Sequence, residues 1–249
     1  MNTLVIGSYG IIGTDLTDIC LNKDERDIFF VDKSDNTKNL KNFFNADFTK
    51  EEEVCSFFNN CKKNNVQFKK IFINAGGATV PYDQYISNVE DLELENWHKI
   101  INGNLDIFFL TIKHLLNTKS YILDSSIVVT SSIHSVIGPR FDTYKGSSYK
   151  GKKMSSSIAY SASKSAMNGM VKYLCSYLSE KRIRINAVLP GGVYSGQEEI
   201  FIKNYSKHVP LGRMANSEEI ANIIYAICSD EFSYMNGQLV IADGGKSSW

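Results

Sequence analysis

The sequence predicts an α/β protein built around a parallel sheet with helices on both faces. Short apolar runs alternate with longer segments whose apolar residues recur at helical spacing. Such alternation is typical of strand–helix–strand units, in which each helix packs against the sheet. The 249 residues contain no internal repeat, low-complexity tract or linker, so we expect a single domain over residues 1–249.

The expected elements follow one another along the chain. Seven runs are expected to be strands, of which Asn42–Asp47 has the weakest pattern: Thr3–Ile6, Asp27–Val31, Asn42–Asp47, Lys70–Asn74, Ser126–Thr130, Arg184–Leu189 and Gln238–Ala242. Five segments are expected to be amphipathic helices: Thr14–Leu21, Glu51–Lys63, Leu94–Leu116, Ile158–Leu178 and Ser217–Cys228. Helix-length crossovers between short strands predict a doubly wound, seven-stranded parallel sheet.

Composition and charge exclude several classes of function. The chain has 27 basic and 27 acidic residues, so its net charge favours neither nucleic acid nor an anionic membrane. No apolar run approaches 18 residues, and no signal peptide precedes the glycines that begin at Gly7. Five cysteines without CxxC spacing and four scattered histidines predict free thiols in a reducing cytoplasm and no metal site. The expected partner is a small molecule.

A glycine-rich turn follows the first expected strand. Gly7, Gly10 and Gly13 are spaced by three residues and precede an expected helix. Such a Rossmann-like turn brings backbone amides and a helix N-terminus close to a pyrophosphate. Asp32 ends the next strand, where a carboxylate accepts hydrogen bonds from a ribose diol and repels a 2′-phosphate. The expected cofactor is therefore NAD(H) rather than NADP.

Tyr160 and Lys164 stand four residues apart in an expected helix, twenty-eight and thirty-two residues after Ser132. That spacing places both on one face of the helix, about one turn apart. A lysine ammonium there favours the phenolate and is expected to lower the tyrosine pKa. With a serine hydroxyl to hold a substrate oxygen, this set can interconvert a ketone and an alcohol. Taken alone, the tyrosine–lysine spacing is also common on solvated helices.

These features resemble the short-chain dehydrogenase/reductase family, and further motifs extend the resemblance over the whole chain. Ala46-Asp47-Phe48-Thr49 is similar to the acidic motif that holds the adenine ring, and Asn74-Ala75-Gly76-Gly77 to the motif that closes the fourth strand. The helix around Asn102-Gly103-Asn104 aligns with the one that carries an active-site asparagine. Pro190-Gly191-Gly192 resembles the turn over the nicotinamide, and Asp243-Gly244-Gly245 the family's ending.

The resemblance assigns roles to individual residues. It implies that Tyr160 is the general acid in reduction and the general base in oxidation, that Lys164 lowers its pKa, that Ser132 holds the substrate oxygen, and that Asn104 anchors a water in the proton relay. The implied cofactor-binding residues are Gly7, Tyr9, Gly10, Ile12, Gly13, Asp32, Asp47, Phe48, Asn74, Ala75, Gly76, Tyr160, Lys164, Pro190, Gly191 and Val193.

The chain departs from the common family pattern in four places. Ile6 replaces the usual threonine before the first glycine, and Ile11 replaces a frequent glycine. Ser135, three residues after Ser132, replaces a second frequent glycine. The gap between Ser132 and Tyr160 is also longer than is usual. No departure removes a catalytic group, but the long gap alters the wall of the substrate pocket.

The segment 138–157 fills that gap and is basic. Gly138–Met154 has five basic residues and one acidic residue. The segment is either a solvated basic loop or a site for a phosphate, diphosphate or carboxylate. Its local pattern resembles bacterial relatives that act on surface and flagellar sugars such as legionaminic acid. The candidate substrate residues are His134, Arg140, Tyr144 and Tyr149.

We therefore expect an NAD(H)-dependent oxidoreductase acting on a phosphorylated, nucleotide-linked or acidic sugar in surface-polysaccharide or flagellar-glycan biosynthesis. The alternatives are a 3-oxoacyl-carrier-protein or generic ketone reductase, a sugar-nucleotide epimerase or dehydratase, and a non-catalytic NAD-sensing or scaffolding module. The resemblance implies a homodimer or homotetramer packed through the helices that carry Asn104 and Tyr160. Whether Tyr194–Tyr205 closes over the substrate as a lid stays open.

Overall fold

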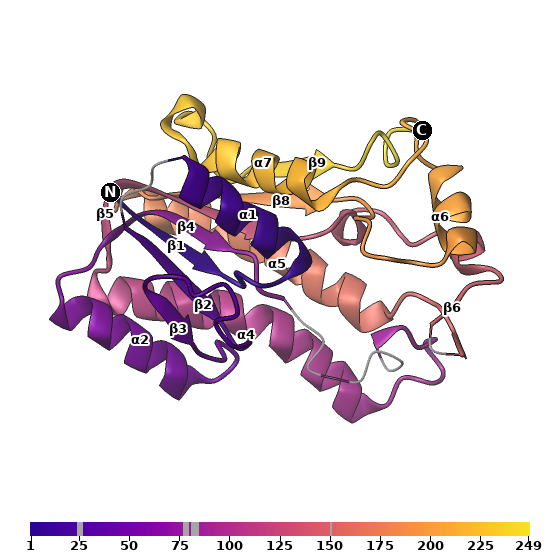
Figure 1. Ribbon diagram of the computed structural model, residues 1–249, viewed down its shortest axis with the longest axis horizontal. Coiled ribbons are helices and arrows are strands. Elements are labelled where there is room, and N and C mark those ends of the chain that lie inside the picture. Colours follow the sequence, from indigo (N-terminus) through magenta and orange to yellow (C-terminus); the bar gives the residue numbers. More distant parts are fainter. Residues whose placement is uncertain (24–26, 77–79, 81–84, 150) are drawn as a thin grey trace.

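The main sheet contains seven strands, all parallel to their neighbours. They are β1 (Asn2–Ile6), β2 (Ile28–Asp32), β3 (Phe43–Asn45), β4 (Phe68–Ile73), β5 (Tyr121–Thr130), β8 (Arg184–Pro190) and β9 (Leu239–Ala242). Their order across the sheet is β3-β2-β1-β4-β5-β8-β9, so the chain winds outward from β1 in one direction and then in the other (Figure 1). This computed structural model describes residues 1–23, 27–76, 80, 85–149 and 151–249.

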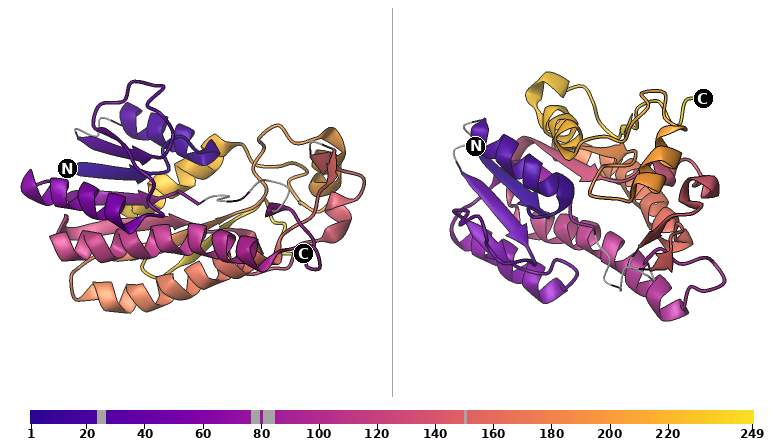
Figure 2. Two further views of the ribbon diagram at one scale, coloured as in Figure 1. Left: turned by 90° about the horizontal axis from the view of Figure 1, so that it is seen from below. Right: turned by 45° about the vertical axis from the view of Figure 1, so that its right-hand side comes forward.

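Helices cover both faces of the sheet (Figure 2). The longer helices are α1 (Ile11–Asn22), α2 (Glu51–Lys63), α4 (Leu94–Thr118), α5 (Ile158–Ser179), α6 (Glu199–Ser206) and α7 (Ser217–Cys228). Helices α2, α4 and α5 pack side by side on one face, and α1 packs with α7 on the other. The predicted doubly wound α/β fold is therefore confirmed.

The apolar runs are continuous because both sides of each central strand are buried. In β1, Leu4 and Ile6 join the core beneath α2, α4 and α5, whereas Val5 lies in the core beneath α1 and α7. All three side chains are at most 1% exposed. This two-sided burial is the reason that strands of parallel sheets read as unbroken apolar segments.

Local signals explain where the helices begin. Asn216 and Glu219 form a capping box at the start of α7, in which each side chain accepts from the other residue's backbone. The side chain of Ser157 accepts a hydrogen bond from the Ala159 amide and caps α5. Three glutamates occupy the first turn of α2, where their negative charges interact favourably with the positive end of the helix dipole.

The N-terminal turn is held by two glycines that tolerate no side chain. Gly7 has φ +83°, and a Cβ there would lie 2.6 Å from the Ala75 amide nitrogen. A Cβ on Gly13 would lie 1.8 Å from the Gly7 carbonyl oxygen, so α1 packs directly onto the turn. Helix α1 begins at Ile11, three residues earlier than the sequence predicts, which places its first amides at the turn.

Several short elements were not expected from the sequence. Helix α6 lies between β8 and α7, and an antiparallel hairpin joins β6 (Ser148–Tyr149) to β7 (Lys152–Lys153) within the 138–157 segment. The 3-10 helices η1 (Ile133–Ser135) and η2 (Phe141–Tyr144) precede this hairpin. These elements are short, so their periodic signal is weak and neighbouring segments stabilise them.

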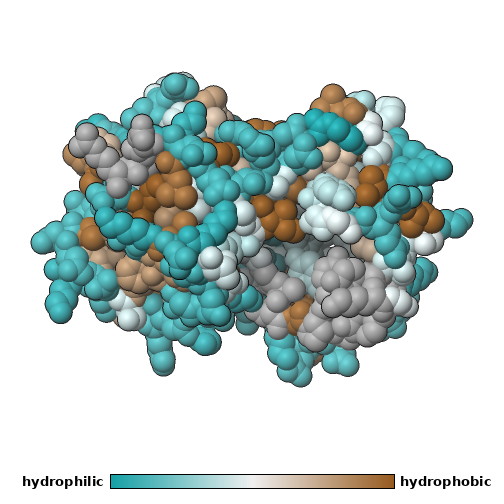
Figure 3. All heavy atoms as spheres, in the orientation of Figure 1, coloured by the Kyte–Doolittle hydropathy of each residue, from teal (hydrophilic) through white to brown (hydrophobic). Residues whose placement is uncertain are grey.

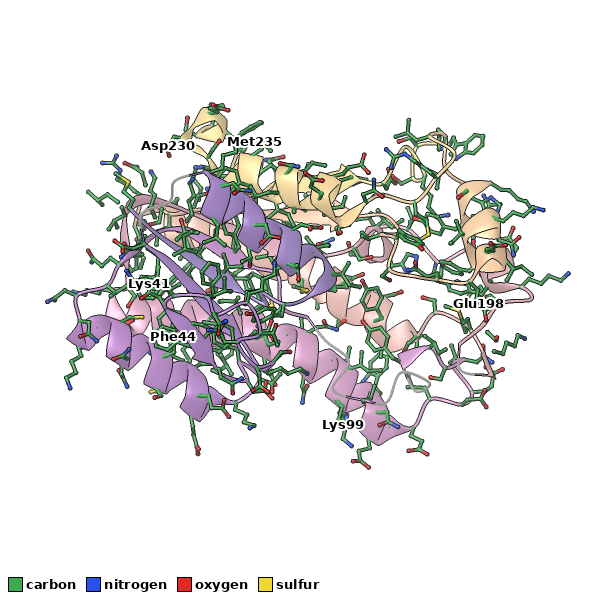
Figure 4. The ribbon with its side chains drawn as sticks, in the orientation of Figure 1. Lys41, Phe44, Lys99, Glu198, Asp230 and Met235 are labelled. Atoms are coloured by element: carbon green, nitrogen blue, oxygen red, sulfur yellow. The ribbon has the colours of Figure 1, made fainter. Side chains whose placement is uncertain are left out.

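The 138–157 segment, α6 and the tail 243–249 gather at one end of the molecule, and we call them the lobe (Figure 1). Met154, Phe201 and Tyr205 form an apolar cluster at its centre. The amide and hydroxyl of Ser148 both donate to the carboxylate of Glu198, at 2.8 and 3.0 Å. Figure 4 places Glu198 beside α6, far from Asp230 and Met235. The segment is thus anchored by side-chain contacts rather than wholly solvated.

The surface shown in Figure 3 is mostly hydrophilic, and its hydrophobic side chains form small separate groups. Within the ranges that the structure describes, no helix is both long enough and apolar enough to cross a membrane.

Candidate active site

Two adjoining cavities open where the strands of the sheet end. One has a volume of about 330 Å³ and the other about 220 Å³, and both are bordered by Gly10, Asn74 and Gly76. Asp32 lies in the smaller cavity and Tyr160 in the larger. Together they form an elongated site along the carboxyl edge of the sheet, which is where doubly wound folds bind ligands.

Four predicted catalytic residues converge on the larger cavity from three elements. Asn104 lies in α4, Ser132 follows β5, and Tyr160 and Lys164 lie one turn apart in α5. The chain separates Asn104 from Lys164 by sixty residues, yet both border the same space. The fold therefore brings together the four side chains that the sequence singled out.

Lys164 is buried and held in place by the backbone. Its side chain is 5% exposed, and its Nζ donates to the carbonyl oxygen of Thr130 at 3.0 Å. Burial lowers the pKa of Lys164 to about 8, because the charged form loses its hydration. The ammonium lies 5.8 Å from the centre of the Tyr160 ring.

The pKa of Tyr160 differs from the sequence-based expectation. Burial raises this pKa, and the hydrogen bond with the Ser132 side chain opposes the change only in part. Removing a phenolate from water costs more than that one hydrogen bond offsets. In the protein alone, Lys164 therefore does not lower the pKa of Tyr160 below its ordinary value.

Ser132 is oriented by the turn that follows β5. Its Oγ accepts from the His134 amide at 3.2 Å and caps η1. A second layer supports this turn: the Ser131 hydroxyl donates to Asn168 at 3.0 Å, and Asn168 donates to the Ser135 hydroxyl at 2.8 Å. The serine that replaces a common glycine at position 135 therefore ties the turn to α5.

Asn104 has one satisfied and one unsatisfied end. Its amide nitrogen donates to the Ile100 carbonyl at 3.1 Å and to the Ser163 hydroxyl at 3.0 Å. Its Oδ1 atom is buried and finds no hydrogen-bond partner among the described residues. Because a buried acceptor is rarely left unpaired, this oxygen points to a ligand or water in the cavity.

Asp32 is positioned at the far end of the site by two backbone amides. Tyr9 donates to one carboxylate oxygen at 2.8 Å, and Ser34 donates to the other at 2.9 Å. Lys38, a cation in the following loop, is paired with Asp18 at 2.8 Å. The carboxylate therefore borders the smaller cavity with lone pairs available to hydroxyl donors.

The predicted cofactor residues divide between the two cavities. The smaller is bordered by Gly7, Tyr9, Gly10, Asp32, Asp47, Phe48, Asn74, Ala75 and Gly76. The larger is bordered by Gly10, Ile12, Asn74, Gly76, Tyr160, Lys164, Pro190, Gly191 and Val193. Gly13 borders neither and instead allows α1 to approach the turn. Gly77, part of a quoted motif, lies outside the described residues.

The geometry of this site fits a dinucleotide. A Cβ on Gly10 would meet its nearest atom at 3.6 Å, an ordinary contact, so the protein itself does not require glycine there. The space that a side chain would fill opens instead onto both cavities and the first turn of α1. A bare helix N-terminus beside such a space suits a pyrophosphate.

The four candidate substrate residues are placed differently. The His134 ring packs edge-on against Tyr160, with ring centres 6.2 Å apart. Arg140 is more than half exposed, with Nε 3.8 Å from Asp142 Oδ1. Tyr144 packs against Phe201 inside the lobe rather than lining either cavity. The side chain of Tyr149 lies outside the described part of the structure.

Sequence reasoning missed two residues near the reaction centre. Tyr85 borders the larger cavity, and its ring lies 5.5 Å from that of Tyr160. Lys246 is buried in the lobe and places its charge near His134. The one signal in the sequence that could have pointed to Lys246 was its position directly after the Asp243-Gly244-Gly245 motif.

Across the described ranges, no group of three or more His, Cys, Asp or Glu residues could hold a metal.

Comparisons with known proteins agree with this geometry. Residues 22–247 match the family model described as enoyl-(acyl carrier protein) reductase. A 3-oxoacyl-(acyl-carrier-protein) reductase of Thermotoga maritima is 28% identical over 183 residues, covering 72% of this chain and 67% of that protein. The post-translational flagellin modification protein A of Campylobacter coli is 31% identical over 120 residues, covering 48% of this chain and 45% of that protein.

A solved structure extends the likeness to the whole fold. The short chain dehydrogenase of Leptospira borgpetersenii, solved with bound NAD+, is 25% identical. It superposes with a TM-score of 0.85 over 99% of this chain and 92% of that chain. The family model alone covers most of the sequence. This chain is therefore an oxidoreductase that belongs to the short-chain dehydrogenase/reductase family.

Proposed function

We propose that this chain is an NAD(H)-dependent oxidoreductase that interconverts a hydroxyl and a keto group on an anionic sugar. The observation that carries the proposal is the convergence of Asn104, Ser132, Tyr160 and Lys164 on one cavity. Asn104, Ser132 and Lys164 are buried and hydrogen-bonded, which fixes their direction, and Tyr160 forms a hydrogen bond with the Ser132 side chain. This arrangement supports proton transfer at a substrate oxygen.

Each of the four side chains has a distinct role in this proposal. The Ser132 hydroxyl binds the substrate oxygen, and the Tyr160 hydroxyl donates a proton to that oxygen in reduction or accepts one in oxidation. Lys164 supplies a nearby positive charge, and Asn104 Oδ1 holds a water for the proton relay. When bound, the nicotinamide supplies the hydride chemistry.

Asp32 carries the preference for NAD(H) in this proposal. Its carboxylate is held at the smaller cavity by the amides of Tyr9 and Ser34, with lone pairs available to a ribose diol. A 2′-phosphate beside this charge would be repelled. The Leptospira relative, which was solved with NAD+, supports the same assignment.

The sugar substrate is supported by the lobe. Its 138–157 segment has more basic than acidic residues and is anchored by Ser148 to Glu198, at the start of α6. The Campylobacter relative, a post-translational flagellin modification protein, supports a role in flagellar modification. A second candidate, reduction of a 3-oxoacyl thioester, is favoured by the Thermotoga relative and by the description of the family model.

We further propose that two copies of this chain associate through α4 and α5. A groove of about 600 Å³ runs between these helices and is bordered by Phe109, Met170, Tyr173 and Tyr177. Tyr173 is 70% exposed and Phe109 53%, an unusual amount of aromatic surface for a face without a partner.

We also propose that the protein acts in a reducing cytoplasm, because its five cysteines are free thiols.

The test is NADH oxidation by purified protein against three panels: neutral keto-sugars, phosphorylated or acidic keto-sugars, and acyl-thioester ketones. We expect turnover of an anionic sugar, and we expect Tyr160→Phe to lower kcat by roughly a hundredfold or more while NADH still binds. NADPH serves as the cofactor control. Turnover restricted to thioester ketones would favour the second candidate, reduction of a 3-oxoacyl thioester, over a sugar substrate. Full activity of Tyr160→Phe would refute the role assigned to Tyr160.

A further inference from the structure

Lys246 is a buried lysine whose ammonium has no hydrogen-bond partner within the described part of the chain. Its residue is 7% exposed, and its Nζ atom makes no hydrogen bond to any described atom. The ammonium lies over the Tyr205 ring, 4.3 Å from the ring centre. A lysine ammonium has three donors and is costly to bury, so a buried one whose donors no protein group uses is a candidate group for binding an anion.

The nearby carboxylates are occupied by other groups. Asp243 accepts from the amides of Gly245 and Ser247, at 2.9 and 2.7 Å, and so closes the turn that carries Lys246. Asp142 is 3.1 Å from the His208 ring nitrogen. Neither acid hydrogen-bonds to the Lys246 ammonium, although the charge of each is felt there. Neither acid therefore uses the donors of Lys246.

Lys246 lies close to the reaction centre through two sets of contacts. The Tyr205 hydroxyl beneath it accepts a hydrogen bond from the Gly192 amide, and a Cβ on Gly191 would lie 3.1 Å from that hydroxyl. Gly191 borders the cavity that contains Tyr160. Tyr205 thus spans the short distance between the ammonium and the cavity wall.

His134 forms the second link. Its ring packs against Tyr160, and its pKa is lowered to about 4, first by burial and then by the charge of Lys246. His134 is therefore neutral at physiological pH and adds no positive charge of its own. Lys246 is the cation whose charge acts on His134, and the charge of Arg140 acts on Lys246 from the exposed side of the lobe.

We propose that Lys246 binds the anionic group of the substrate, a carboxylate or a phosphate, with Arg140 completing the subsite from the outer side. The assignment rests on the proposed function, since it names the part of the substrate that the lobe recognises. An ammonium is a point charge that accepts either anion, and the guanidinium of Arg140 offers paired donors. Lys246 is in this sense a specificity residue rather than a catalytic one.

The first experiment measures anion binding without turnover. The NADH complex, in which the dinucleotide site is filled, is titrated calorimetrically with inorganic phosphate and separately with acetate. We expect wild type to bind at least one of them and Lys246→Met to bind it about tenfold more weakly or worse. Lys203→Met, which removes an exposed charge from the same lobe, serves as the matched control and should bind as wild type does.

Folding does not confound this comparison. Replacing an unpaired buried ammonium with an apolar side chain of similar length should keep or raise the melting temperature. Lys246→Arg, which restores the charge, should recover part of the binding. Equal binding by wild type and Lys246→Met would overturn the proposal, and so would a wild type that binds neither anion.

The second experiment compares matched sugars that differ only in a phosphate or a carboxylate. We expect Lys246→Met to raise KM for the anionic sugar about tenfold with a much smaller change in kcat, and to leave kcat/KM for the neutral sugar nearly unchanged. Sugar turnover that is insensitive to Lys246→Met would remove the subsite but keep the proposed function. Lys246-dependent phosphate binding without turnover of any sugar would support the anion-binding role of Lys246 and contradict the assignment of a sugar substrate.

Discussion

Asn104 and Lys164 flank a single point in the cavity. A Cβ on Gly76 would lie 3.0 Å from Asn104 Oδ1 and 3.2 Å from Lys164 Nζ, so a methyl group there would crowd both polar atoms. A water in this space, farther from the Gly76 backbone than that Cβ, would accept a hydrogen bond from the ammonium and donate one to the carboxamide oxygen. Such a water would satisfy the unpaired Asn104 oxygen and link α4 to the tyrosine–lysine pair.

Gly76→Ala tests this arrangement, because the new methyl group would occupy the point between the two side chains. We expect kcat to fall about tenfold or more, since proton transfer by a positioned relay contributes on that scale. Steady-state kinetics measure the effect, and NADH fluorescence titration reports any loss of cofactor binding. Asn104→Ala, which keeps the space and removes the oxygen, is the paired variant. A Gly76→Ala enzyme with normal kcat would show that no relay passes this point.

The buried ammonium of Lys164 predicts how stability depends on pH. Its pKa is about 8 in the folded chain and near 10.5 when exposed. Between these values the unfolded chain binds more protons, so the free energy of unfolding rises with pH as this penalty is relieved. The Lys164→Met variant has no ammonium to bury, so it does not carry this desolvation penalty at any pH.

We therefore expect the stability of wild type relative to Lys164→Met to increase by about 2–3 kcal/mol between pH 8 and about pH 10. Urea denaturation at a series of pH values, without cofactor, measures the difference. Lys203→Met, which replaces an exposed lysine, should show the same pH dependence of stability as wild type. Parallel curves for wild type and Lys164→Met would contradict the lowered pKa.

Asp32→Ser should change the cofactor preference. Removing the carboxylate relieves repulsion of a 2′-phosphate by about 1–4 kcal/mol, so the ratio of kcat/KM for NADPH to that for NADH should rise roughly tenfold or more. Initial rates with both cofactors give this ratio. Asp35→Ser, an exposed acid three residues later, is the control and should leave it unchanged. An unaltered ratio in Asp32→Ser would place the selectivity elsewhere.

Tyr173→Glu should disrupt the proposed association through α4 and α5. A charge in the middle of the aromatic groove would have to be buried between two copies, which is strongly unfavourable. Sedimentation analysis should show the wild type as a multiple of 28.0 kDa and the variant shifted toward the single chain. Tyr234→Glu introduces the same charge at a fully exposed tyrosine and should not alter the mass.

The parts of the site that the sequence predicts are those encoded by local backbone requirements. Gly7 and Gly13 are needed because of the positive φ and the close approach of α1, and these constraints recur wherever such a turn occurs. Asp32 is recognisable because it ends a strand beside that turn. The pairing of Tyr160 with Lys164 follows from one helical turn.

Other parts depend on packing between distant segments. Lys246 is buried over Tyr205, a residue forty-one positions earlier, and no local pattern announces that contact. The sequence predicts a lowered pKa for Tyr160 because it shows a neighbouring charge but cannot show the burial that outweighs it. Helix α6 was missed although Phe201 and Tyr205 have helical spacing, because eight residues are too few for a decisive pattern.

The close contact between Gly13 and Gly7 has a thermodynamic consequence. The turn between β1 and α1 is locked by the packing of the protein itself, and its amides from Gly7 to Gly10 already have hydrogen-bond partners within the chain. A dinucleotide that binds there need not order this stretch of backbone, so little conformational entropy opposes the association. That entropy is lost once, when the chain folds, and not again in each catalytic cycle.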